Sequence, residues 1–156
     1  MRTFDDHALE QRKATLVAKL DDLGDVTVDD IGALTGARRL DVVVAAPGLG
    51  LQPIVEFAYS EIFSRGARRR WSLVRYVYEY REQPGPGRRA YHWHDDRFHA
   101  HCVDRVWPER DHHFRATEVD LFEAHEEFVR LYASGARVSC DDLRPALAAS
   151  GPEELG

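Results

Sequence analysis

The sequence predicts an α+β fold: an antiparallel meander of four to five strands, with a C-terminal helix packed on one face and an N-terminal helix at one edge or across the same face. Residues 54–63 and 71–82 alternate apolar and polar side chains, as strands do. A third alternating run, 89–103, is divided by Asp95-Asp96, a turn signal between two strands. Residues 7–23 and 121–134 instead repeat apolar side chains at helical spacing.

Length and composition favour one soluble domain spanning 1–156. A chain of 156 residues buries roughly 70% of its unfolded surface, which suffices for one core. Its hydrophobic content of 44% and charged content of 31% are those of a globular protein. The charged N-terminus and the lack of an apolar run near ~18 residues predict neither signal peptide nor anchor, so we expect a cytoplasmic location and no membrane partner. Cys102 and Cys140 form no disulfide framework and no paired zinc motif, which suits a reducing compartment.

Charge is distributed unevenly along the chain. Residues 1–63, 64–115 and 116–156 carry net charges of −5, +5 and −6, so the overall −6 conceals a basic middle third. A basic segment between acidic ones indicates a local site for an anionic ligand such as RNA. The competing interpretation is that the three segments neutralise one another in the fold.

The N-terminal third combines a helix with turn-rich sequence. Asp5 or Asp6 can cap the helix at 7–23, and Gly24 can end it. Residues 28–39 resemble the centre of a helix-turn-helix, but 41–46 is a better short buried strand than a recognition helix, which disfavours sequence-specific DNA binding. The Gly48-Leu49-Gly50 run lacks the remaining residues of a phosphate-binding loop, so we expect a turn.

The C-terminal half completes a sheet predicted over 54–119 and adds the packing helix. The loop at 84–87 joins neighbouring strands, and 111–115 can form a fifth extended segment. Asp120 and Glu123 form a capping box for the helix at 121–134, and Gly135 is placed for a left-handed cap. Ser139 with Asp142 can cap a short last helix cut by Pro145, and we expect a loose tail over 145–156. The helix should bury a stripe of Leu121, Ala124, Phe128 and Leu131, with Phe122, His125 and Tyr132 at its edges.

The hairpin in 89–103 concentrates chemistry on one side of the sheet. An even loop with Asp95 and Asp96 at its centre places His94 opposite Arg97 and segregates apolar from polar side chains, whereas an odd loop would mix them. One face then carries Tyr91, Trp93, Phe98, Ala100 and Cys102, and the other carries His92, His94, Arg97, His99 and His101.

Three kinds of chemistry suit four histidines on one strand surface. Three imidazoles can hold a divalent transition metal and leave a position open for water, although the sequence lacks the acidic continuation of a cupin His-x-His motif and any HExxH. Paired histidines can also cleave a phosphodiester without metal, one removing a proton from a 2′-hydroxyl and the other protonating the leaving oxygen. Plain RNA binding through aromatic stacking is the third. The structural alternative is that histidine merely supplies a polar, solvated sheet face.

The order of motifs over about 71–134 resembles the TumE-type toxins of prokaryotic toxin-antitoxin modules. The resemblance implies a small cytoplasmic protein with a meander and a helix, held inactive by a cognate antitoxin and acting on RNA, and it marks His112 and His113 as secondary site candidates. In this chain Val106-Trp107-Pro108 follows Asp104-Arg105, where members tend to carry an Arg-x-Asp-Asn segment leading into Pro-His-His. The resemblance rests on Tyr78-Glu79-Tyr80, the loop at 84–87, Tyr91-His92-Trp93-His94, Val103-Asp104-Arg105, Pro108, Asp111-His112-His113 and the closing helix.

These observations together lead to a hypothesis of a toxin-like protein that acts on RNA by metal-independent histidine acid/base chemistry. The alternatives are a histidine-rich metal-binding hydrolase or oxygenase that uses the same four histidines, and a non-enzymatic binding or assembly module with the hairpin as partner surface. Whether the protein is an enzyme stays open at this point. The acid/base candidates are His92, His94, His99 and His101, and the phosphate-binding candidates are Arg97, Arg88 and Arg89.

Overall fold

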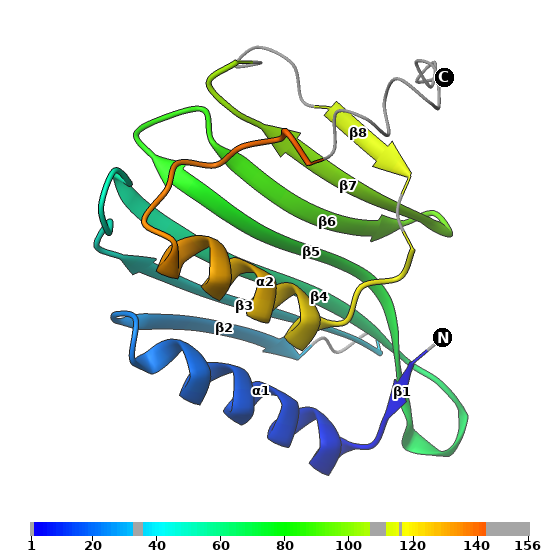
Figure 1. Cartoon of the computed structure of the whole chain (residues 1–156). Coiled ribbons are helices and arrows are strands. Elements are labelled where there is room, and N and C mark those ends of the chain that lie inside the picture. The colour runs from blue at the N-terminus through cyan, green and yellow to red at the C-terminus, as the bar shows by residue number, and fades with distance from the viewer. Residues whose placement is uncertain (1, 33–35, 107–111, 116, 143–156) are drawn as a thin grey trace.

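An antiparallel sheet forms the body of the protein in a computed structural model that describes residues 2–32, 36–106, 112–115 and 117–142. In these residues the sheet has eight strands in the order β2-β3-β4-β5-β6-β7-β8, with β1 paired to one end of β5 (Figure 1). The strands are β1 (Thr3–Phe4), β2 (Val26–Gly32), β3 (Ala37–Ala46), β4 (Ile54–Arg65), β5 (Trp71–Gln83), β6 (Arg88–His94), β7 (Arg97–Val103) and β8 (His112–Arg115); a short 3₁₀ turn, η1 (Ala67–Arg69), joins β4 to β5.

The predicted α+β class and antiparallel meander are confirmed, but the sheet is larger than predicted and starts well before residue 54. The helix-turn-helix likeness of 28–39 is wrong, because residues 28–32 belong to β2 and residues 37–39 to β3. β2 lies at the edge of the sheet and is exposed along most of its length. It therefore carries little of the apolar alternation by which buried strands are recognised.

Two helices cover the same face of this sheet (Figure 1). α1 (Asp6–Asp21) begins where the Asp5 carboxylate accepts a hydrogen bond from the Ala8 amide at 2.7 Å. α2 (Leu121–Ala133) begins with the predicted capping box of Asp120 and Glu123, and Gly135 beyond it has the left-handed φ of +66°. Both predicted helices are thus confirmed to within two residues at each end.

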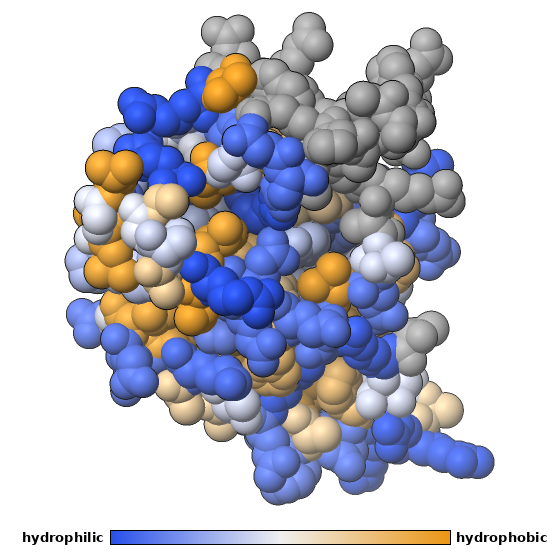
Figure 2. All heavy atoms as spheres, viewed as in Figure 1, coloured by the Kyte–Doolittle hydropathy of each residue, from blue (hydrophilic) through white to orange (hydrophobic). Residues whose placement is uncertain are grey.

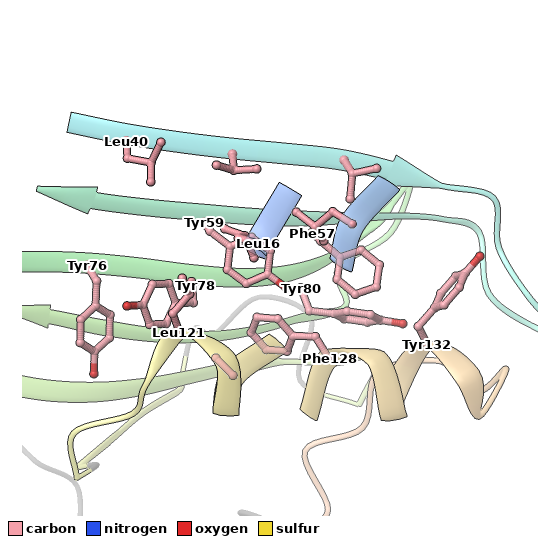
Figure 3. Close-up of a cluster of buried hydrophobic side chains, with 14 of the residues drawn as sticks. Leu16, Leu40, Phe57, Tyr59, Tyr76, Tyr78, Tyr80, Leu121, Phe128 and Tyr132 are labelled. Atoms are coloured by element: carbon pink, nitrogen blue, oxygen red, sulfur yellow. The ribbon is translucent and has the colours of Figure 1, made fainter. Parts of the chain in front are cut away.

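The core lies between this helical layer and the sheet. Alternate residues of β4 and β5 point toward the helices and meet the buried stripe of α2 (Figure 3). Phe128 packs against Tyr59, Tyr80 and Tyr91, with ring centroids about 6 Å apart. The stripe of α2 is rotated from the predicted one, since His125 and Tyr132 are buried while Leu131 is partly exposed.

A charged pair is buried in this core. Arg12 of α1 donates two hydrogen bonds to Glu61 of β4, at 3.0 and 2.7 Å, and the Tyr78 hydroxyl donates a third at 2.6 Å. Burial alone would lower the pKa of Arg12, but the Glu61 carboxylate outweighs that cost and raises it. The pair connects the helical layer to the centre of the sheet.

The segment after α2 runs back over the helix-covered face and is joined to β7 by a disulfide between Cys102 and Cys140. The prediction of two unpaired cysteines is therefore wrong: Cys102 is buried as expected, but its sulfur is bonded to a residue 38 positions away. Asp104, which the strand pattern leaves at the end of β7, is buried and accepts a hydrogen bond from the Cys140 amide at 2.8 Å.

The outer surface of the helical layer is mostly hydrophilic, and hydrophobic side chains gather at its left margin, where β3 leads into β4 (Figure 2). The loop between these strands exposes Leu49 and Leu51. Within the described ranges, neither helix is long and apolar enough to span a bilayer. Residues 139–142, expected to cap a last helix, are not helical, and Pro108 and 143–156, with the rest of that helix and the tail at 145–156, lie outside the described residues.

Candidate functional site

The β6–β7 hairpin has the predicted register. His94 lies opposite Arg97, His92 opposite His99 and Ala90 opposite His101. Asp95 and Asp96 have φ values of +50° and +58°, the left-handed pair that a two-residue hairpin turn requires. All four histidines therefore occupy the face of the sheet that α1 and α2 do not cover, which we call the open face.

On the open face the imidazole rings form two layers. The rings of His92 and His101 lie 4.1 Å apart between centroids, and those of His94 and His99 lie 5.3 Å apart. His101 is only 6% exposed, and the His92 side chain is 15% exposed, whereas the His94 side chain is 40% exposed. A ligand on the open face can therefore reach His94 more readily than the inner pair, whereas His99 beside it is half-buried and its Nε2 is buried.

Glu79 of β5 supports the inner pair. Its carboxylate accepts hydrogen bonds from Arg81, at 2.5 Å, and from Arg88, and lies 3.4 Å from His92 Nε2. Burial alone would raise the pKa of Glu79, but hydrogen bonds from His92, Arg88 and Arg81 overcome it and hold the pKa well below its usual range. The carboxylate is thus charged near neutral pH, and Arg88 is bound to it as part of a structural cluster.

The outer pair borders a hollow at the end of the hairpin. His94 Nδ1 lies 3.1 Å from the Asp95 carboxylate, an arrangement that orients the imidazole and leaves Nε2 on its other side. The hollow has a volume of about 490 Å³ and is lined by Ile62, Val74, Arg75, His94 and Asp95. We call it the His94 hollow.

A β-bulge explains why the sheet surface is depressed at this point. The β4–β5 register shifts between Ile62 and Phe63, so Val74 is an extra residue in β5. Arg75, beside the bulge, is exposed and lines the hollow with His94. Exposed Arg97 lies directly across the hairpin from His94. Two guanidinium groups thus come from strands on either side of one imidazole.

Arg89 is not brought to this surface. It points to the helix-covered face, where it is bound by Asp142 at 2.8 Å and by Glu127 at 3.2 Å. Burial alone would lower the pKa of Arg89, but these carboxylates raise it. Alternation along β6 explains the separation, because Arg88 and Arg89 necessarily face opposite sides.

The secondary candidates lie in the strand next to β7. The β7–β8 register sets His113 opposite His101 and His112 opposite Cys102. Their backbone therefore continues the sheet beside the histidine layers, at its edge. Among the residues that the structure describes, no group of three or more histidine, cysteine or acidic side chains is arranged to hold a metal ion.

Three residues of the site were not among its predicted members: Arg75, Glu79 and Asp95, which the sequence predicts only as part of the turn. Arg75 and Glu79 belong to the same alternating set of β5, and the β5–β6 register pairs Glu79 with Ala90 and Val77 with His92. The signal was present in the alternation of 71–82, which already groups Arg75 with Glu79. The sequence did not predict the register between β5 and β6, which brings Arg75 and Glu79 beside the histidines.

Comparisons with known proteins identify no relative of this chain. No family model matches the chain, and neither the curated proteins nor the solved structures contain a match. The function must therefore be argued from the geometry of the open face.

Proposed function

We propose that the protein cleaves RNA at the His94 hollow by metal-independent acid/base chemistry. One observation carries the proposal: an exposed imidazole, oriented through Nδ1 by Asp95, shares a hollow with the exposed guanidinium of Arg75 and stands beside a second imidazole. An oriented base, a second proton carrier and an anion-binding cation are the groups that phosphodiester transfer requires.

The proton of the substrate hydroxyl moves first in this mechanism. With Nδ1–H donating to Asp95, His94 Nε2 carries the lone pair and takes the proton of a ribose 2′-hydroxyl. The 2′-oxygen then bonds to phosphorus as the bond from phosphorus to the 5′-oxygen breaks. His99, entering as the imidazolium, gives its Nδ1 proton to that leaving oxygen, because its Nε2 is buried. The products are a 2′,3′-cyclic phosphate and a free 5′-hydroxyl.

The arginines act on the phosphate. Arg75 and Arg97 lie on the two sides of His94 and are exposed, so both can contact the non-bridging oxygens on which negative charge develops. Glu79, His92 and Arg88 lie further along the strands from the His94 hollow and contact one another. Their role in this proposal is to fix the strand positions of the outer pair.

The toxin role belongs to the same proposal. The motif order that resembles TumE-type toxins suggests that cleavage of cellular RNA would arrest growth and that a cognate antitoxin would cover the open face. This biological role predicts growth inhibition when the protein is expressed alone, with the same dependence on His94 and His99 as cleavage in vitro.

The test compares a double His94→Gln, His99→Gln variant with His7→Gln, which removes an exposed histidine of α1. We expect RNA cleavage by the untagged protein to persist in EDTA, to leave 2′,3′-cyclic phosphate ends, and to fall by about 10²–10⁴-fold in the double variant. The His7→Gln control should cleave normally. Cleavage that survives in the double variant, or that EDTA abolishes, would refute the mechanism; growth inhibition by the double variant would refute the toxin role.

A further inference from the structure

A second hollow adjoins the His94 hollow on the open face. It has a volume of about 270 Å³ and shares two of its walls, Ile62 and Arg75, with the first. The remaining lining comes from β3, β4 and β5, and consists of Arg39, Ser60, Tyr76 and Val77. We call it the Arg39 hollow.

The strand register builds this hollow. Arg39, Ile62 and Arg75 lie directly opposite one another on three neighbouring strands. Because neighbouring strands are about 4.8 Å apart, the two arginine backbones are roughly 10 Å apart, with an apolar side chain between them. The next row contains Ser60 and Val77, whose small side chains leave the surface low.

The chemistry of the lining suits a flat ring. Guanidinium groups stack on aromatic faces, and Ile62 and Val77 supply an apolar floor for a base. Arg39 Nε is held 2.7 Å from Asp41 Oδ2, which restrains its guanidinium. Asp41 lies in the row beside Ser60 and holds Arg39 from outside the lining of the hollow.

We propose that the Arg39 hollow binds the nucleobase of a nucleotide next to the scissile phosphate. The inference rests on the proposed RNA cleavage and names a part of its substrate: Arg75, shared by both hollows, contacts the phosphate while the base occupies the space between Arg75 and Arg39. The site then binds a base and a phosphate together, and Arg39 and Ser60 govern affinity without touching the reacting atoms.

Direct binding tests this assignment without cleavage. The probes are adenosine 5′-monophosphate and ribose 5-phosphate, which lacks the base, titrated into ¹⁵N-labelled protein. Ser60→Trp fills the hollow, Arg39→Ala removes one wall, and Ala45→Trp places the same bulk on an exposed position of β3 outside it. We expect both hollow variants to weaken adenosine monophosphate binding at least tenfold, and Ala45→Trp to leave it unchanged. Ribose 5-phosphate should bind more weakly than the nucleotide and be insensitive to Ser60→Trp.

Either of two results overturns the assignment: equal binding of the two probes to the unaltered protein, or nucleotide binding that both hollow variants leave intact. Arg39→Ala keeps the test valid if Ser60→Trp fails to fold. The cleavage assay separates the two proposals. Nucleotide binding that depends on Arg39 in a protein that cleaves no RNA sustains the base site and refutes the chemistry. Cleavage that depends on His94, with a KM unaffected by Arg39→Ala and Ser60→Trp, refutes the base site.

Discussion

Arginine and histidine side chains occur on both faces of the sheet, but they are structural on the helix-covered face and available to a ligand on the open face. On the helix-covered face every buried arginine is matched to carboxylates, as Arg12 is to Glu61 and Arg89 to Asp142. On the open face Arg75 is exposed, and its guanidinium makes no ion pair with any described residue. A buried cation must be paired because desolvation is costly, whereas a solvated cation is free to bind a ligand. Burial therefore distinguishes the structural arginines from the candidate functional ones.

The histidines repeat this contrast. His125 of α2 is buried and its Nδ1 lies 2.8 Å from the Tyr59 hydroxyl. Burial raises the pKa of Tyr59, so the hydroxyl keeps its proton and donates a hydrogen bond to the neutral imidazole. His94 instead lies beside a solvated carboxylate. One ring completes the core, and the other is available to a substrate.

The largest expected effect comes from breaking the buried ion pair. Arg12→Met leaves the Glu61 carboxylate buried with only Tyr78 to satisfy it, and should cost about 3–5 kcal/mol of unfolding free energy in urea denaturation. Arg75→Met, the same change on the open face, should cost less than about 0.5 kcal/mol. Equal losses in the two variants would contradict the distinction between the faces.

A double variant sharpens this experiment. Arg12→Met combined with Glu61→Leu removes both charges, and should be more stable than Arg12→Met alone because no unpaired charge remains in the core. A double variant no more stable than the single one would show that packing of the arginine stem, rather than charge, accounts for the loss.

The disulfide should have the next largest effect. It closes a loop over a sequence separation of 38, so Cys140→Ser should lower the unfolding free energy by about 2–4 kcal/mol. Reduction of the unaltered protein should produce a similar loss, whereas dithiothreitol should leave Cys140→Ser unchanged. Nucleotide binding on the open face should persist in all of these samples. Loss of that binding would show that the two faces are coupled.

Local patterns were enough to predict much of the fold and part of the site. The turn at Asp95-Asp96 and the alternation on both sides of it fix the hairpin register, because a slip by one residue would move His92 and His94 to the apolar face. The capping box at Asp120 likewise acts within four residues. Contacts between residues this close in the chain depend on the local sequence and can be predicted without a structure.

Long-range features could not be read in this way. The exposed edge strand β2 has few buried positions to show a period, and the bond between Cys102 and Cys140 depends on how the chain returns across α2. The two hollows depend on the register of β3, β4 and β5 and on a bulge at Ile62. Arg89 is a different case: alternation along 89–103 already separates it from Arg88, and only its pairing with Glu127 and Asp142 depends on the long-range fold.

The smallest expected effect is the pH dependence of the covered face. Burial lowers the pKa of His125, with Lys19 of α1 acting in the same direction and Glu126 opposing it. In the unfolded chain the imidazole protonates at its ordinary value near 6.5. The unfolded state therefore binds the proton first as the pH falls, so the contribution of neutral His125 is present above about 6.5 and is lost as the pH falls toward the lower folded value. Urea denaturation between pH 7.5 and 5 should show this loss, and His125→Gln, which cannot titrate, should have a flatter profile. If the unfolding free energy of His125→Gln fell as steeply with pH, other groups would account for the dependence. His125 would then not distinguish the covered face from the open one.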